Sequence, residues 1–250
     1  MQIAITFRQP SKCFCYFFDK HFINYIGEIM NKLKILCIPG WNEGCNVFDK
    51  IKNDLKDFFD FIYVELPGFN NNKTPPYAFY PIDYAKYIFE KTNNEFDFIL
   101  AHSYGGKVAV EYYLNICKVP LILLAPSIIK PKKTIIVRLK IFIYKTRKKL
   151  GLLKNKEYGS KDFINSSGIM RKVFMNAINT YYDNKLDQLS SKTLLIYGDK
   201  DKQTPFKEGK KIYKINKNIR LVKIDGDHFA LINKEFQISK LIYKFVREDL

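Results

Sequence analysis

The stretch Phe98-Ile-Leu-Ala101-His102-Ser103-Tyr104-Gly105-Gly106 decides the fold that this sequence predicts. An apolar run stops at Ser103, and small residues stand two positions before and after that serine. A strand that bends sharply into a helix has room only for Gly or Ala at those two positions. The pattern therefore predicts a strand, a tight turn with Ser103 at its apex and then a helix, with the serine hydroxyl presented as a nucleophile.

Strands and helices alternate on both sides of this stretch. Leu121–Leu124 is apolar throughout, as expected of a parallel strand that is covered on both faces. Short connections and crossover helices between such strands are typical of a doubly wound, mostly parallel sheet of the α/β class. The sequence predicts strands at 35–38, 61–65, 98–103, 121–124, 193–197 and 220–224, and helices at 45–59, 81–93, 105–116, 205–215 and 230–247.

The composition indicates one domain with a large core. Of the 250 residues, 47% are hydrophobic and 16% aromatic, which excludes a disordered chain. No run reaches the roughly 18 apolar residues that a membrane span needs. The cysteines are odd in number and lack paired metal-ligand spacing; they are Cys13, Cys15, Cys37, Cys45 and Cys117. We therefore expect reduced thiols in a cytoplasmic protein without a metal or cofactor.

The first 29 residues have two interpretations. They precede a second methionine, Met30, which is soon followed by the predicted strand at 35–38. In the first interpretation, residues 1–29 are an upstream extension of a protein that begins at Met30. In the second, Gln2–Phe7 forms an extra edge strand. Both interpretations stay open at the level of sequence.

The alternation of strands and helices stops between residues 127 and 187. This span of about sixty residues is too long for a simple loop in a compact α/β domain. Apolar residues at 135–152 and 163–182 suggest helices within it. We therefore expect an α/β core at 30–126 and 188–250, interrupted by a basic helical insertion at 127–187.

The insertion carries much of the formal charge of +17. Residues 130–156 include eleven Lys or Arg and no Asp or Glu. One interpretation is a solvated lysine-rich face, and another is a surface that attracts an acidic carrier protein or an anionic lipid membrane. The basic residues do not gather on one helical face, which weakens a membrane-lying helix. Nucleic acid is the weakest candidate, because no aromatic stacking residues on a recognisable RNA-binding fold accompany the charge.

Polar residues follow three of the predicted strands. Ser103 follows one strand, Asp199 and Asp201 follow another, and His228 follows the last in Asp225-Gly-Asp-His-Phe229. Because the carboxyl ends of parallel strands meet at one edge of a sheet, these side chains are expected at the edge where ligands bind. The chain order Ser, Asp, His is the order that α/β hydrolases use.

The sequence resembles the α/β-hydrolase superfamily from about Lys34 to Val246, in its serine esterase, lipase and thioesterase branch. The residues at 101–106 resemble the nucleophile elbow, with Ala101 in place of the usual first glycine. Ile38-Pro-Gly-Trp41 resembles the segment that supplies one oxyanion-hole amide, and Gly198-Asp-Lys-Asp201 resembles the acid-bearing loop. Glu65-Leu-Pro-Gly-Phe69 resembles a further family motif, and the insertion stands after the sixth family strand, where the family carries a helical cap or lid.

The resemblance implies a serine hydrolase that acts on a carboxylic ester or thioester through an acyl-enzyme. Ser103 would be the nucleophile, His228 its base and Asp201, rather than Asp199, the carboxylate that orients the histidine. The backbone amides of Trp41 and Tyr104 would form the oxyanion hole. The resemblance implies no cofactor or metal, and a small ester or thioester as substrate.

Two questions stay open at this stage. A non-catalytic protein that docks an acidic carrier protein or an anionic membrane through residues 130–156 is the alternative to an enzyme. Apolar residues of the insertion line an acyl pocket in one interpretation and form a small core of their own in the other; these are Phe163, Ile164, Met170, Phe174, Met175, Tyr181 and Tyr182. His102 is expected to pack at the elbow rather than to act as a second base.

Overall fold

The computed structural model describes residues 32–131, 160–190, 192–229 and 235–249, together with 143, 144, 146, 147, 149 and 150. The described residues contain one sheet with the strand order β2-β1-β3-β4-β5-β6, and every pair of neighbouring strands is parallel. The strands are β1 (Leu33–Ile38), β2 (Phe59–Tyr63), β3 (Phe98–His102), β4 (Leu121–Leu124), β5 (Thr193–Gly198) and β6 (Arg220–Ile224). The chain order reverses at β1, so β1 and β3 meet at the point where open α/β sheets form their binding crevice.

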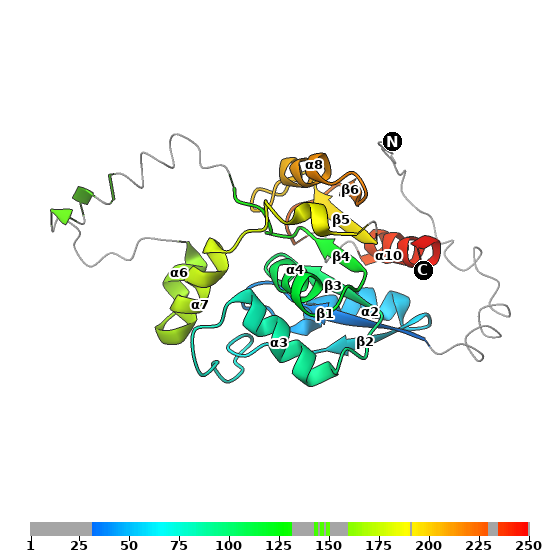
Figure 1. The fold of residues 1–250 in the computed structure, drawn as a ribbon, viewed down its shortest axis with the longest axis horizontal. Coiled ribbons are helices and arrows are strands. Elements are labelled where there is room, and N and C mark those ends of the chain that lie inside the picture. Colours follow the sequence, from blue (N-terminus) through cyan, green and yellow to red (C-terminus); the bar gives the residue numbers. More distant parts are fainter. Residues whose placement is uncertain are drawn as a thin grey trace.

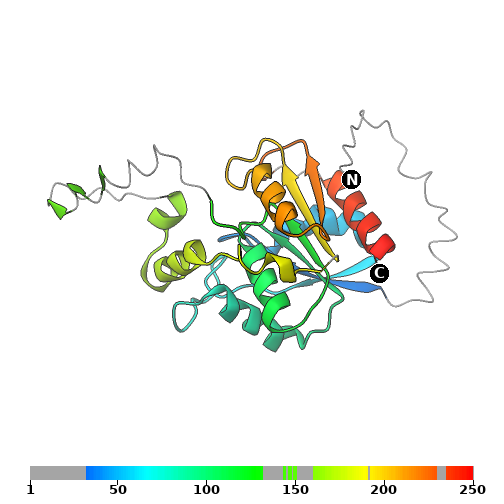
Figure 2. The same cartoon turned by 45° about the horizontal axis from the view of Figure 1, so that its top comes forward.

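Helices cover both faces of the sheet (Figure 1). The helices α3 (Pro81–Thr92), α4 (Gly105–Asn115) and α8 (Phe206–Ile215) pack on one face. The helices α2 (Asp49–Leu55) and α10 (Glu235–Asp249) pack together on the other face, and a short 3-10 helix, η1 (Cys45–Phe48), leads into α2. The turned view in Figure 2 shows the sheet between the two groups. The predicted doubly wound α/β fold is therefore confirmed.

The central strands alternate their side chains between two separate cores. On β1, Leu36 and Ile38 face the α3–α4 side, whereas Ile35 and Cys37 face α2 and α10. On β3, Ile99 likewise faces the α3–α4 side. Because both faces are covered, β1 is apolar throughout 35–38 and β3 throughout 98–101, which are the apolar runs that the sequence shows.

The chain between β4 and β5 forms two helices, α6 (Lys161–Asn165) and α7 (Gly168–Asn179), and a 3-10 turn, η2 (Leu186–Gln188). Val173 and Ala177 of α7 are buried in the same core as α3 and α4. The Asn176 side-chain amide donates hydrogen bonds to the carbonyl oxygens of Ala78 and Phe79, at 3.0 and 3.2 Å. The helix α7 is therefore anchored on the loop before α3, and Figure 1 shows α6 and α7 together at one end of the molecule.

The predicted helix at 45–59 is too long, and the strand after it begins earlier than predicted. The helix α2 ends at Leu55, whose carbonyl oxygen accepts a hydrogen bond from the Phe58 amide at 2.9 Å and closes a turn. Phe59 then pairs with Leu33 in the sheet. The turn at 56–58 contains no glycine or proline, and its polar residues Lys56 and Asp57 also suit the exposed face of a helix, so the pattern did not reveal it.

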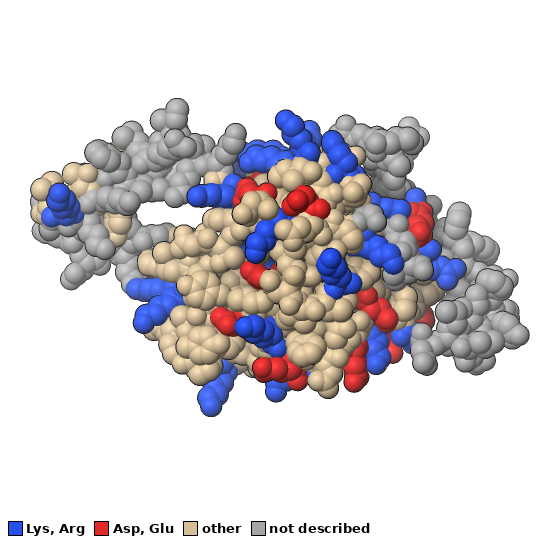
Figure 3. All heavy atoms as spheres, viewed as in Figure 1, with Lys and Arg blue, Asp and Glu red and all other residues tan. Residues whose placement is uncertain are grey.

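Residues 1–29 and most of the basic segment at 130–156 lie outside the described residues, so both interpretations of each stay open. Figure 3 shows Lys and Arg side chains distributed over the visible face, with Asp and Glu among them. Of the helices in the part that the structure describes, none has the length and apolar character to cross a membrane.

Gly105, the first residue of α4, lets that helix approach the end of β1 closely. A Cβ atom at this position would lie 2.3 Å from the carbonyl oxygen of Ile38 and 2.6 Å from that of Pro39. Backbone atoms cannot move aside as a flexible side chain can, so a larger residue would push α4 away from β1. The close approach holds the turn at Ser103 against the loop that follows β1.

Replacing Gly105 with alanine should lower the free energy of unfolding by about 1–3 kcal/mol, because the added methyl group overpacks this contact. Urea denaturation of both proteins measures the difference. Asn115→Ala, at the exposed far end of the same helix, is the control and should change stability by less than about 0.5 kcal/mol. Equal effects of the two substitutions would contradict the close-packing argument.

Candidate active site

Ser103 stands in a strained turn between β3 and α4. Its φ angle is +49°, in the left-handed region that residues other than glycine seldom adopt. The Ser103 amide donates to the carbonyl oxygen of Leu124 at 2.9 Å, and the Ser103 carbonyl oxygen accepts from the amides of Gly106 and Ser127, both at 3.1 Å. Backbone hydrogen bonds on both sides therefore hold the serine in this conformation.

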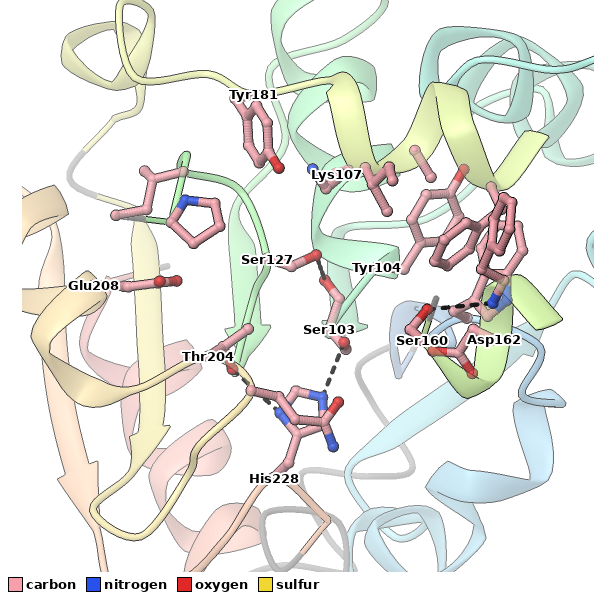
Figure 4. A pocket seen from close by; sticks show the side chains of 18 residues that line it. Ser103, Tyr104, Lys107, Ser127, Ser160, Asp162, Tyr181, Thr204, Glu208 and His228 are labelled. Carbon is pink, nitrogen blue, oxygen red and sulfur yellow. Dashed lines mark hydrogen bonds between the residues drawn. The ribbon is translucent and has the colours of Figure 1, made fainter. Parts of the chain in front are cut away.

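The structure brings three of the predicted site residues together. Nε2 of His228 lies 3.0 Å from Oγ of Ser103, and Nδ1 of His228 lies 2.7 Å from Oδ2 of Asp201. Asp201 follows β5 and His228 follows β6, so the three side chains come from three loops at one edge of the sheet. Figure 4 shows the His228 ring directed at Ser103. Asp199 lies in a different contact, where its Oδ1 accepts from the Gly226 amide at 2.9 Å.

Asp201 is buried among hydrogen-bond donors. Its Oδ1 accepts from the backbone amides of Gln203 and Thr204 at 2.7 and 2.9 Å. The Thr204 hydroxyl lies 2.8 Å from Oδ2 of Asp201 and 3.2 Å from Nδ1 of His228. Burial by itself would raise the pKa of Asp201, but the hydrogen bonds from His228 and Thr204 outweigh it and lower the pKa below its usual value. The carboxylate is therefore ionised at neutral pH.

The two predicted oxyanion-hole residues flank Ser103. Trp41 lies in the loop after β1, and Tyr104 directly precedes the first turn of α4. Within the described ranges, no group accepts a hydrogen bond from either backbone amide. The Trp41 ring packs edge-on against Phe69, Tyr104 and Phe174, with ring centroids 5.0 to 5.4 Å apart. These contacts fix the loop that carries the Trp41 amide.

The partly buried Glu43 and the fully buried His102 form a hydrogen-bonded pair next to the site. Nδ1 of His102 is 3.0 Å from Oε2 of Glu43, which also accepts from the Gly40 amide at 2.8 Å. The other ring nitrogen, Nε2, lies 3.3 Å from the carbonyl oxygen of His228. Burial by itself would raise the pKa of Glu43, but the hydrogen bond from His102 leads a set of interactions that lower it. This pair joins the loop after β1 to the loop after β6.

The sequence did not identify Glu43, because a single carboxylate in a polar turn has no distinguishing pattern. His102, which was expected to pack at the elbow, is fully buried there and also forms this hydrogen-bonded pair. The sequence holds an acid after the Pro-Gly turn of the first strand and a histidine at the end of a later strand, but only the sheet order brings the two together.

Ser103 and His228 open into a cavity of about 620 Å³. Part of its wall comes from the segment between β4 and β5, and its apolar lining includes Trp41, Phe163, Phe174, Ala177, Ile178 and Tyr181. The apolar residues of that segment are therefore divided among the cavity wall, the core and the surface. Phe163, Phe174 and Tyr181 line the cavity, Tyr182 is buried in the core, and Ile164 and Met175 are exposed.

Replacing Glu43 with alanine should lower the free energy of unfolding by about 1–3 kcal/mol, because the Gly40 amide and the buried His102 ring lose their acceptor. Thermal or urea denaturation measures the loss. Glu65→Ala, which removes an exposed carboxylate that accepts from Asn72, is the matched control and should have a much smaller effect. A Glu43 variant as stable as the control would show that the Glu43–His102 pair contributes nothing.

Comparisons with known proteins identify the family and the fold of this chain. A family model described as serine hydrolase (FSH1) matches residues 81–238, which is more than half of the chain. No curated protein matches the chain.

Solved structures show the same fold. An esterase from Exiguobacterium antarcticum is 18% identical to this chain with a TM-score of 0.68, and the match covers 87% of this chain and 92% of the esterase. An esterase from Thermogutta terrifontis is 17% identical, with a TM-score of 0.65 and coverage of 87% and 90%. The thioesterase domain of the curacin biosynthetic pathway is 15% identical, with a TM-score of 0.62 and coverage of 85% and 92%. At these identities the structural likeness establishes the fold, and the family model adds that the chain belongs to the FSH1 serine hydrolase family of α/β-fold enzymes.

Proposed function

We propose that this hydrolase cleaves a carboxylic ester or thioester through an acyl-enzyme on Ser103, with His228 as base and Asp201 as its orienting acid. The observation that carries the proposal is the chain of hydrogen bonds from Ser103 Oγ to His228 and on to Asp201, at 3.0 and 2.7 Å, at the wall of one cavity. Chains of this kind activate a serine whose hydroxyl is otherwise a weak nucleophile.

In the first half-reaction, Ser103 Oγ attacks the carbonyl carbon of the substrate and its proton passes to Nε2 of His228. The Asp201 carboxylate holds the Nδ1 proton of the same ring and stabilises the imidazolium that forms. The tetrahedral intermediate then collapses: the bond to the alcohol or thiol breaks, and His228 returns the proton to that leaving group. The acyl group stays on Ser103.

In the second half-reaction, water takes the place of the leaving group. His228 accepts a proton from this water while the water oxygen attacks the acyl carbon. The same proton passes to Ser103 Oγ when the carboxylic acid departs. In both intermediates the carbonyl oxygen carries a negative charge, and we assign its stabilisation to the backbone amides of Trp41 and Tyr104. Such fixed donors usually contribute a factor of about 10²–10³ each in turnover.

The lining of the site and the known activities of similar structures support the proposed substrate class. Two of the similar structures are esterases and one is a thioesterase domain, and the same attack by Ser103 serves both kinds of bond. The aromatic and aliphatic lining suits an acyl group with an apolar portion. The helices α6 and α7 would act as the cap that shapes this lining, as part of a division into a core at 30–126 and 188–250 and a cap at 127–187.

An acidic carrier protein or anionic membrane as a partner of residues 130–156 remains a prediction, as does the cytoplasmic location. Most of that basic segment lies outside the described residues. No specific contact in the described part favours a docking function over hydrolysis.

Ser103→Ala should lower the rate of hydrolysis of p-nitrophenyl esters of graded chain length by about 10⁴-fold or more, because the nucleophile is lost. Ser127→Ala is the matched control: it removes a neighbouring hydroxyl that donates to the Ser103 carbonyl oxygen at 3.4 Å, and its loss of rate should be far smaller. Hydrolysis by Ser103→Ala at the native rate would overturn the proposal.

Asp201→Asn should lower kcat by about 10³–10⁴-fold, since an amide cannot hold the His228 ring in the reactive tautomer. Asp199→Asn is the control, because its side chain can still accept from the Gly226 amide, and its kcat should stay within a few-fold of the native value. Steady-state kinetics on one p-nitrophenyl ester compares the two. Similar losses in both variants would argue against the assignment of Asp201.

A further inference from the structure

A buried lysine, Lys107, lines the same cavity as Ser103 and His228. It belongs to the first turn of α4, and the residue is 3% exposed. In Figure 4, Lys107 and Tyr181 lie on the opposite side of Ser103 from His228. A substrate whose carbonyl carbon is held at Ser103 therefore has Lys107 within the space available to the rest of the molecule.

The Lys107 ammonium has more donors than the protein uses. Its Nζ donates to the carbonyl oxygen of Thr180 and lies 4.2 Å from the centroid of the Tyr181 ring. An ammonium carries three N–H donors, and neither contact supplies a negative charge. Lys107 forms no ion pair with any residue that the structure describes. The carboxylates of Asp183 and Glu208 act on Lys107 without forming a direct ion pair with it. A buried cation without a directly paired counter-ion is unfavourable, so this arrangement favours an anionic ligand.

Lys107 carries its charge at neutral pH. Burial lowers its pKa to about 8, and the nearby carboxylates of Asp183 and Glu208 act in the opposite direction. Oδ2 of Asp183 accepts a hydrogen bond from the Lys130 amide at 2.9 Å. No other Lys or Arg is among the described residues that line the cavity.

Two carboxylates, Asp162 and Glu208, and the His228 ring also line the cavity. Glu208 is buried, and its burial raises its pKa, against the influence of Lys211 and Lys207. When it is ionised, Glu208 opposes an anion that enters the cavity. Lys107 therefore attracts an anionic substrate and ionised Glu208 repels it. Removing each charge should change the preference for anionic substrates in opposite directions.

We propose that Lys107 binds a carboxylate carried by the substrate, so that the preferred substrates are esters or thioesters with a free carboxylate in the same molecule. This inference rests on the proposed function, because the position of the ester at Ser103 defines where the carboxylate lies. The carboxylate belongs either to the acyl part or to the alcohol part, and the two sources differ in the substrates that reveal them.

The kinetic test compares charged esters with uncharged esters of equal length. The acyl arm uses monomethyl succinate, glutarate and adipate beside methyl esters of the matching monocarboxylic acids. The alcohol arm uses acetyl esters of hydroxy acids beside acetyl esters of the matching alcohols. In at least one arm, Lys107→Met should lower the ratio of kcat/KM for charged over uncharged substrate by about 10- to 100-fold. An unchanged ratio in both arms would overturn the proposal.

Two further variants keep the test decisive if Lys107→Met folds poorly. Glu208→Gln should raise the same ratio, because it removes a competing negative charge. Lys107→Arg should retain a preference for the charged ester above pH 8, where the native preference falls as Lys107 loses its proton. Lys86→Met removes an exposed charge on α3, away from the cavity, and should leave the ratio unchanged. A Glu208→Gln ratio that stays the same or falls would contradict the proposal.

A binding measurement separates this inference from the proposed chemistry. Calorimetric titration of Ser103→Ala with the charged ester of whichever arm shows the preference should show binding that weakens about 10- to 100-fold when Lys107→Met is added. Equal binding by the single and double variants, or none by either, would overturn the role of Lys107. Hydrolysis of the ester by Ser103→Ala would instead overturn the proposed function, so the two failures are distinguishable.

Discussion

The left-handed backbone of Ser103 is the constraint on which the site depends. A serine in this conformation is unfavourable by itself, and it persists because β4 and α4 hold it by hydrogen bonds on both sides. Gly105 then allows α4 to pack directly against the end of β1. The same packing that presents the hydroxyl also places the Trp41 loop and the Tyr104 amide beside it. The backbone hydrogen bonds and the packing that position the active site thus also compensate for the strain at Ser103.

A second set of contacts fixes the positions of the loops at the sheet edge relative to one another. The Glu43–His102 pair connects the loop after β1 with the loop that carries His228. On the other side of the His228 ring, Thr204 contacts both Asp201 and His228, and its hydroxyl also lies 3.1 Å from the carbonyl oxygen of Ala125 after β4. The ends of β1, β3, β4, β5 and β6 are therefore linked through polar groups. Such networks fix geometry because each unsatisfied member would be unfavourable.

The sequence predicted the fold and the site to the extent that local patterns carry them. The tight turn at Ser103 requires small residues around it, and these are visible in the sequence. The order of Ser103, Asp201 and His228 along the chain follows from the order of the strands that precede them. Spacing alone did not separate Asp201 from Asp199; the resemblance made that choice, and the structure places Asp201 beside the histidine. The roles of Glu43 and Lys107 depend on neighbours more than fifty residues away along the chain, which no local pattern encodes.

The central claim is that Ser103 forms an acyl-enzyme, and peptide mass spectrometry of the enzyme quenched during turnover tests it most directly. A proteolytic digest of the native protein, taken while a p-nitrophenyl ester is still being consumed, should contain the peptide with Ser103 increased in mass by the acyl group, and the adduct should disappear once the substrate is exhausted. An acyl adduct at another residue that forms and decays with turnover would contradict the account.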